Sequence, residues 1–313
     1  MSSEDHAALT ELAAQLTAHR TAFARVTVVR AQPPTSAHAG DLALVTADGR
    51  MHGFVGGQCA AESVRVAAVD AIADGEDLLL RILPAEADTF PETACARVVV
   101  NPCMSGGALE LFIEPVLPAP IVHVAGDTPI AVAVVAQAKL LGFAVTQQQS
   151  AEEAGLLGAE PDGAVASVIA THGGDEAGLI RAALDRAVPY IGLVASRRRG
   201  AAVLATMELT ASQRDSIHTP AGIDIGAVTA AEVALSILAQ VVSAIRRDGI
   251  RTSVSTVSDS APAGRREIDP ICGMTVVVTD ETPTTTDESG SHWFCCLGCR
   301  DTYLDRAGLQ ATR

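Results

Sequence analysis

The chain has 313 residues, a formal net charge of −15 at pH 7 and a hydrophobic content of 48%. This length accommodates two compact domains and a small appendage, and the hydrophobic content supports buried cores, which excludes global disorder. The negative charge argues against a nucleic-acid-binding surface, because such a surface needs clustered Lys and Arg side chains.

Short segments of the sequence indicate the cellular location of the protein. The first six residues contain neither the basic nor the apolar segment of a secretory signal, and the most apolar stretch, 121–145, is interrupted by polar residues. We therefore expect a cytoplasmic protein without a membrane span. In a reducing cytoplasm the seven cysteines are not expected to form disulfides. Four of them lie between 272 and 299, which favours metal or redox chemistry there.

Residues 1–117 have the pattern of a mixed α/β domain. Apolar periodicity predicts helices over 5–19 and 59–73, and Asp48-Gly49 between two apolar runs predicts a β-hairpin. Other apolar runs predict strands at 23–30, 78–83, 97–100 and 109–114.

Residues 118–247 change to alternating strands and helices. The predicted strands are short apolar runs at 121–125, 144–148, 165–170 and 190–195. The predicted helices lie at 130–141, 176–186, 198–208 and 230–245. Repeated strand–helix units predict a Rossmann-like, doubly wound parallel sheet with helices on both faces.

The last part of the chain has a different composition. Residues 248–266 are rich in Ser, Thr, Ala, Gly and Pro, which predicts a flexible linker. Residues 267–313 form a small cysteine-rich module, too short to be held together by apolar packing alone. It needs a metal, a partner or docking onto the body. The predicted class is α/β, with this module added to the two larger domains.

Two cysteines of the first domain lie beside glycine pairs. Cys59 ends the run Gly56-Gly57-Gln58-Cys59 before a predicted helix, and Cys103 precedes Ser105-Gly106-Gly107 at a strand exit. Glycine pairs let a bound group approach the backbone, and a helix N-terminus stabilises a thiolate. Both cysteines are therefore candidate catalytic thiols, acting as metal ligands or sulfur carriers. The alternative is that each is a small buried cysteine beside a tight turn. The predicted cofactor contacts around them are Gly56, Gly57, Gln58, Ser105, Gly106 and Gly107.

The second domain offers further cofactor contacts where strands end. Its first strand–helix turn retains only Gly126 of a dinucleotide fingerprint, and 147–149 are glutamines where an acid would bind a ribose. NAD(P) binding is therefore disfavoured. Arg197 is the preferred phosphate partner, because a guanidinium binds phosphate bidentately. A solvated helix start is the alternative for this arginine-rich segment. The predicted contacts are Gly126, His172, Ser196 and Arg197.

The tail carries a metal-ligand pattern. Cys295 and Cys299 are one helical turn apart, and Cys272 supplies a third thiolate from a distant turn. Thiolates suit Cu(I) or Zn(II), and the residue types do not choose between them. A purely structural site and a delivery site both remain open.

At these residues the chain resembles the XdhC/CoxI family, which comprises accessory proteins for molybdenum hydroxylases such as xanthine and carbon monoxide dehydrogenases. The likeness covers about residues 10–247. It rests on the GGxC and CxSGG elements, EPVLP at 114–118, the strand–SRRR segment, and PAGIDIGA at 220–227 leading into Glu232 and Ser236. The tail resembles a YHS domain through DPICGM and FCCLGC; Cys272, Cys295 and Cys299 align with that pattern, and Cys296 is additional.

The resemblance implies a maturation chaperone more than a conventional enzyme. It implies transient binding of molybdenum cofactor, protection during sulfuration of the metal, and transfer to an apo-enzyme client. The branch that serves carbon monoxide dehydrogenase has a client whose site also contains copper, which suits a thiolate-rich tail. The expected partners are an apo molybdenum hydroxylase and a sulfur donor protein, and a homodimer is left open.

The expected arrangement has Cys59 and Cys103 facing a cleft between the two large domains, where they hold the molybdenum centre or relay sulfur. Two other functions stay open. One is an NAD(P)-dependent oxidoreductase, and the other is a copper carrier that binds no molybdenum cofactor.

Overall fold

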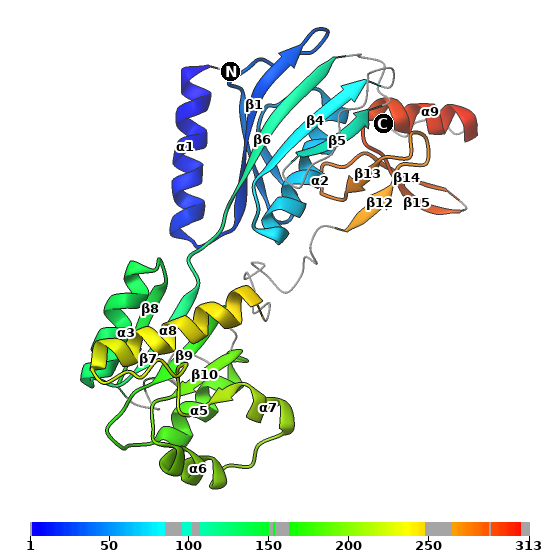
Figure 1. The fold of residues 1–313 in the computed structure, drawn as a ribbon. Coiled ribbons are helices and arrows are strands. Elements are labelled where there is room, and N and C mark those ends of the chain that lie inside the picture. Colours follow the sequence, from blue (N-terminus) through cyan, green and yellow to red (C-terminus); the bar gives the residue numbers. More distant parts are fainter. Residues whose placement is uncertain are drawn as a thin grey trace. The chain divides into compact units, whose positions relative to one another are not determined.

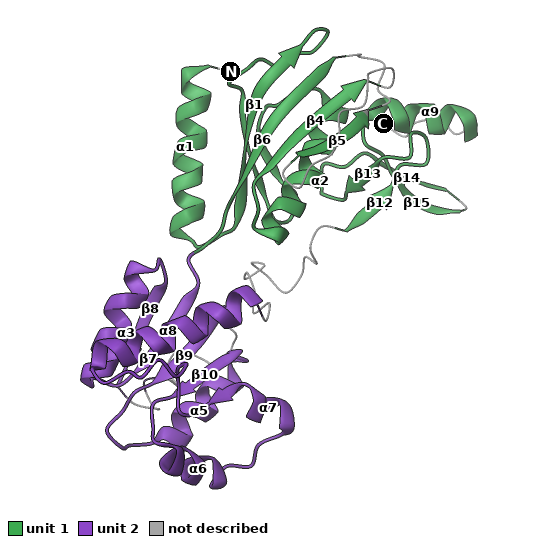
Figure 2. Ribbon diagram, in the orientation of Figure 1, with its two compact units in different colours: residues 1–118, 256–313 green, residues 119–255 purple. Residues whose placement is uncertain are grey.

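The computed structural model describes residues 2–84, 96–101, 107–149, 153, 163–247, 265–287 and 289–307. They belong to two compact units, which are coloured separately in Figure 2. Unit 1 comprises residues 1–118 together with 256–313, and unit 2 comprises residues 119–255. The C-terminal tail thus forms one unit with the N-terminal region. Among the described residues, no helix has the length and apolar character needed to cross a membrane.

Unit 1 contains a six-stranded mixed sheet in the order β3-β2-β1-β6-β4-β5 (Figure 1). Only β4 and β5 run parallel; the other neighbours are antiparallel. The strands are β1 (Phe23–Gln32), β2 (Leu42–Thr46), β3 (Met51–Gly53), β4 (Leu78–Pro84), β5 (Ala96–Asn101) and β6 (Ala108–Val116).

Two helices cover this sheet. α1 (Ser3–Ala18) begins with a capping box between Ser2 and Asp5 and packs Leu9 against Phe23 of β1. α2 (Gln58–Asp74) packs against β1, β4 and β6. Successive residues of a strand point to opposite faces of the sheet, so β1 can contact α1 with one set of side chains and α2 with the other. The predicted helices at 5–19 and 59–73 correspond to α1 and α2.

The tail folds as two small β-ribbons and a helix. β12 (Arg266–Ile268) pairs with β13 (Thr275–Val277), β14 (Thr284–Asp287) pairs with β15 (Gly290–Trp293), and α9 (Leu297–Ala307) follows. Phe294 is fully buried, and the Tyr303 ring lies 5.4 Å from it. The Tyr303 hydroxyl donates to Asp287 Oδ2 at 2.7 Å, which connects α9 to the second ribbon.

Unit 2 is a five-stranded parallel sheet in the order β11-β10-β9-β7-β8. The strands are β7 (Ile121–Ala125), β8 (Ala144–Gln148), β9 (Ala164–Ile169), β10 (Tyr190–Leu193) and β11 (Ile217–His218). The helices are α3 (Pro129–Leu140), α5 (Glu176–Asp185), α6 (Arg197–Ala205), α7 (Ala211–Asp215) and α8 (Ala230–Arg247). α3 and α8 pack on one apolar face of the sheet, and α5 packs on the other.

The predicted α/β class with a Rossmann-like parallel sheet is confirmed. Within unit 2, β7 and β8 have the predicted bounds, whereas α7 and β11 were not predicted because each is only one short turn or bridge. After β8 the chain crosses to the opposite side of β7 to form β9. The carboxyl ends of β7 and β9 therefore flank a topological switch point, where open α/β sheets bind ligands.

Candidate functional site

Cys59 lies in the first turn of α2, just after the N-cap residue Gly57. Gly56 has a φ of +139°, and a side chain there would press against Ala60 and Leu109. Gly57 offers no side chain to cap the helix, so the positive end of the helix dipole is uncapped at Cys59. These glycines therefore have a clear structural role, which is to place Cys59 at an electropositive helix start.

The three predicted tail ligands come together. Cys295 Sγ lies 3.6 Å from Cys272 Sγ and 3.7 Å from Cys299 Sγ. Cys295 is only 5% exposed, while the other two are half-buried. We call Cys272, Cys295 and Cys299 the tail triad. Three thiols at this spacing can hold a thiophilic metal ion.

A buried carboxylate organises the tail triad. Asp269 Oδ1 accepts hydrogen bonds from the N–H groups of Ile271 and Cys272, at 2.8 and 3.3 Å, and Oδ2 accepts from Cys295 N–H at 2.8 Å. Burial opposes the ionisation of Asp269, but these N–H donors outweigh it and lower its pKa. Asp269 thereby joins the two loops that carry Cys272 and Cys295. Its role was not predicted, although Asp followed by Pro is a turn signal in the sequence.

A second group of thiols shares Cys295 with the tail triad. The sulfur atoms of Cys59, Cys295 and Cys296 all lie within 4.8 Å of one another, and we call them the interface triad. Cys59 of α2 thus meets the tail, an encounter that the sequence analysis missed. No local pattern could have revealed it.

The three thiols of the tail triad have raised pKa values. The Cys59 thiol and then burial raise the pKa of Cys295, and burial raises the pKa of Cys272 and Cys299. A metal ion that binds here must therefore displace protons, since the thiolate is the ligand.

Three contacts along α2 hold the tail in place. Leu297 N–H donates to Gln58 Oε1 at 3.3 Å, and Val277 N–H donates to Glu62 Oε1 at 2.6 Å. Arg266 forms an ion pair with Asp70 at 2.5 Å. Glu62 is 2% exposed and also pairs with Arg65. Gln58, predicted as a cofactor contact, therefore helps to fix the cysteine-bearing end of the tail on α2.

Substituting Glu62 with leucine is expected to loosen the tail and to destabilise unit 1 by about 2 kcal/mol, because the Val277 N–H and Arg65 lose a buried partner. Amide hydrogen exchange at Val277 should accelerate. Glu62→Gln is the matched control, since it retains the acceptor for Val277.

The same pair of variants has a pH signature. Burial raises the pKa of Glu62 above its ordinary value. The folded chain then binds the proton more tightly than the unfolded chain, so the free energy of unfolding falls as pH rises through the folded-state pKa. Glu62→Gln should lack this pH-dependent component of stability.

For the exchange measurement, an unchanged Val277 exchange rate in Glu62→Leu would show that the contact between Glu62 and Val277 does not hold the tail.

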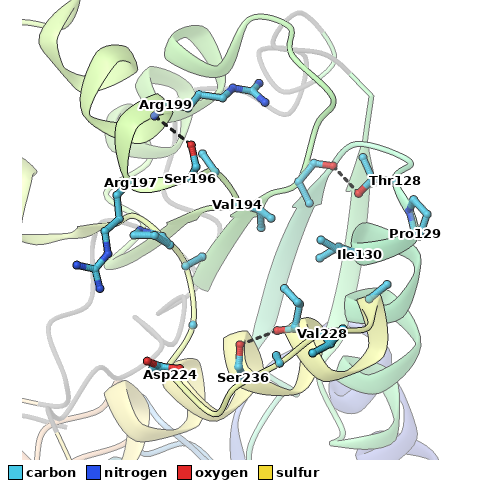
Figure 3. Close-up of a pocket in the computed structure, with 18 of the residues that line it drawn as sticks. Thr128, Pro129, Ile130, Val194, Ser196, Arg197, Arg199, Asp224, Val228 and Ser236 are labelled. Carbon is cyan, nitrogen blue, oxygen red and sulfur yellow. Dashed lines mark hydrogen bonds between the residues drawn. The ribbon is translucent and has the colours of Figure 1, made fainter.

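Unit 2 has a cavity of about 870 Å³ at the switch point (Figure 3). Residues that follow β7, β9 and β10 line it, together with the loop before α8. Among the predicted contacts, His172, Ser196 and Arg197 are in its wall. The loop residues 220–225 also line it; the sequence analysis assigned them no chemistry. We call this the switch-point cavity.

The cavity has one unpaired cationic group in its described wall. Arg199 is paired with the buried Glu176, whereas Arg197 has no carboxylate partner among the residues that the structure describes. The two side chains diverge from each other (Figure 3). Arg197 is the first residue of α6, whose N-cap Ser196 opens on the cavity. A helix N-terminus beside an unpaired arginine favours an anionic ligand.

Two positions that bind the cofactor in a dinucleotide-binding fold, the glycine turn after the first strand and the end of the second strand, make other contacts here. A side chain at Gly126 would lie 2.4 Å from the Ala170 carbonyl oxygen, so close packing of β7 and β9 explains this glycine. Gln147, near the end of β8, donates to the Gly126 carbonyl at 2.9 Å instead of presenting an acid to a ribose.

Part of the predicted site lies outside the described residues: Cys103, Ser105 and Gly106. Gly107 is described, and a side chain on it would lie 2.3 Å from the Pro34 carbonyl oxygen. The expected convergence of Cys59 with Cys103 therefore stays a prediction.

Comparison with known proteins identifies the family. Residues 16–82 match the XdhC and CoxI family, and residues 122–241 match the XdhC Rossmann domain. The two matches together cover more than half of the chain. The chain belongs to the XdhC and CoxI family.

Two individual proteins are similar to this family member. The uncharacterized protein YqeB of Escherichia coli K12 is 27% identical, with the alignment covering 73% of this chain and 44% of YqeB. The chain thus spans less than half the length of that relative. A crystal structure described as a xanthine dehydrogenase from Bacillus halodurans is 15% identical with a TM-score of 0.38, covering 75% of this chain and 95% of that one.

Proposed function

We propose that this chain is a maturation factor for a molybdenum hydroxylase. In this proposal, the switch-point cavity binds molybdenum cofactor transiently, and the thiols of unit 1 handle the metal and its sulfur. Membership of the XdhC and CoxI family supports the accessory role. The observation that carries the cofactor part is Arg197 at the start of α6, which pairs with no carboxylate in the described part of the chain and lies in the wall of a cavity of suitable size.

The cavity fits a phosphate-bearing ligand of this kind. Its volume of about 870 Å³ lies within the usual range for small-molecule sites. Arg197 and the first N–H groups of α6 would hold the phosphate, and His172 and the loop 220–225 would enclose the remainder. The molybdenum cofactor supplies the metal centre that the client enzyme needs. The residues of the switch-point cavity only bind and protect it.

The proposal keeps Cys59 and Cys103 as the thiols that hold the molybdenum centre or relay sulfur, with Gly56, Gly57 and Gly107 beside them. The client is an apo molybdenum hydroxylase of the carbon monoxide dehydrogenase type, and a separate protein donates the sulfur. The tail, as a YHS-like module, handles copper. We place all of this in the cytoplasm.

Arg197→Glu is expected to weaken binding of molybdenum cofactor by about 10- to 100-fold, because a charge-assisted contact of about 1.5–3 kcal/mol is lost and a repulsion gained. The measurement is anaerobic loading of the full chain, followed by assay of bound pterin and molybdenum. Arg198→Glu is the matched control, since Arg198 is exposed one residue further along α6. Equal retention by both variants would contradict the proposed phosphate contact.

A copper carrier without cofactor binding is the second candidate, and the thiol cluster favours it. Wild-type protein that binds copper but retains neither pterin nor molybdenum would select this candidate. An NAD(P)-dependent oxidoreductase is the third candidate, and titration of the protein with NAD(P) tests it. Tight nucleotide binding that Arg197→Glu abolishes would replace the proposal.

A further inference from the structure

Four thiols of unit 1 gather around a fifth, the buried thiol of Cys295. The tail triad and the interface triad have Cys295 in common, and each triad contributes two sulfur atoms of its own. Cys295 is thus within reach of two different groups of ligands. A single metal ion would leave two of the five thiols unused.

We propose that this cluster binds two Cu(I) ions, one in each triad, with the Cys295 thiolate bridging them. Each ion gains three sulfur ligands, and no oxidation or reduction is required; the displaced thiol protons pass to solvent. This inference rests on the copper handling in the proposed function and adds Cys59 and Cys296 to it. While copper is bound, Cys59 is a copper ligand, and Cys103 alone remains for the molybdenum centre or the sulfur relay.

The ligand set favours Cu(I) over Zn(II). Structural zinc takes four ligands almost without exception, whereas each triad offers three thiolates. Asp269 is the other possible ligand near the tail triad, but backbone N–H groups already occupy three of its four acceptor positions, which makes it a weaker fourth ligand than a thiolate. Thiolates suit both ions, so the number of ligands in each triad, three and not four, is what favours Cu(I).

The local field suits an anionic copper–thiolate cluster. Cys59 lies in the first turn of α2, and Cys299 lies in the first turn of α9, which Cys296 directly precedes. The Leu297 N–H to Gln58 contact brings these two helix starts together. Two positive helix ends at one place compensate for the excess negative charge of five thiolates around two monovalent ions.

The cluster also has an access path. A cavity of about 440 Å³ between the tail, α2 and β5 is lined by Cys272 and Met274. Cys272 belongs to the tail triad alone. A copper ion arriving through this cavity would therefore meet the tail triad first, and Cys295 would connect it to the interface triad.

The interface ion would connect α2 to the tail. Cys59 is on α2, while Cys295 and Cys296 precede α9. Copper in this triad would therefore cross-link α2 to the tail, which hydrogen bonds and the Arg266–Asp70 ion pair also join. Copper loading is expected to slow amide exchange at Leu297 and Val277 in the wild type.

The test is an anaerobic titration of the reduced full chain with Cu(I) against a chromogenic competitor for copper. The wild type should bind two ions per chain. Cys59→Ser should bind one and lose the copper-dependent slowing of exchange, and Cys299→Ser should also bind one. Glu62→Gln, which removes no sulfur, is the control and should bind two. Copper–copper scattering in X-ray absorption should be present in the wild type and absent from Cys59→Ser.

One ion per chain in both the wild type and Cys59→Ser would overturn the proposal, and so would two ions in Cys59→Ser. Cys296→Ser gives the same readout should Cys59→Ser fail to fold. No molybdenum cofactor enters the experiment. If the two-copper site is disproved, the Arg197→Glu assay still tests cofactor binding. If cofactor binding is disproved, the copper titration still tests the two-copper site.

Discussion

Cys295→Ser is expected to weaken copper binding at both triads, whereas loss of any other thiol of the cluster should leave one triad intact. Cys295 is the only sulfur shared by the two groups, so each triad would retain just two ligands without it. The apparent affinity for Cu(I) should fall by more than about 100-fold, beyond the effect typical of residues that merely support a ligand. The measurement is the same competition titration.

Cys272→Ser is the matched control for this substitution. It removes a tail-triad sulfur but leaves Cys59, Cys295 and Cys296 intact, so one ion should remain. Serine is close to cysteine in size, and circular dichroism before titration checks that unit 1 is folded. A Cys295→Ser protein that still binds an ion as tightly as the wild type would show that the bridging sulfur is unnecessary.

Gly126→Ala is expected to destabilise unit 2 by about 3 kcal/mol or more. Gly126 has a φ of +107°, a conformation that costs other residues about 1–3 kcal/mol, and the new Cβ would lie 2.4 Å from the Ala170 carbonyl oxygen. Forced overpacking adds about 1–3 kcal/mol. The Thr128 hydroxyl donates to that same oxygen at 2.8 Å, so a shift of Ala170 would also disturb the start of α3. Chemical denaturation of the full chain measures the loss.

Gly142→Ala separates the two contributions. Gly142 also has a positive φ, +82°, but a side chain there meets nothing within 4 Å. This variant should lose only the backbone part, about 1–2 kcal/mol. Equal stability losses in the two variants would mean that contact with Ala170 is unimportant. A stable Gly126→Ala protein that no longer binds cofactor would instead restore Gly126 as a direct contact.

Much of unit 2 was readable from the sequence because its signals are local. Each strand of a buried parallel sheet is a short apolar run, and each helix shows a 3.6-residue period between turns. β7 and β8 accordingly have the predicted bounds. The crossing from β8 to β9, which creates the switch-point cavity, follows from strand order and has no signal in either strand.

The candidate sites divide in the same way. Arg197 and Ser196 could be proposed in advance, because the carboxyl ends of parallel strands share one edge. Asp269 could not, since its function depends on Cys295 N–H, which belongs to a distant loop. The loop 220–225 likewise acquires its place in the cavity wall only through the packing of α8.

By itself, the amino-acid sequence determined the α/β class, the likeness to the XdhC and CoxI family, and the spacing that puts Cys295 and Cys299 on one helical turn. These features depend on neighbours along the chain. Only the tertiary structure decided that Cys59 joins the tail thiols, more than two hundred positions away. That meeting depends on Gln58 and Glu62 accepting hydrogen bonds from tail amides. The donors in these contacts are backbone N–H groups, which every residue except proline carries. The amino-acid sequence therefore does not indicate which N–H group binds Gln58 or Glu62.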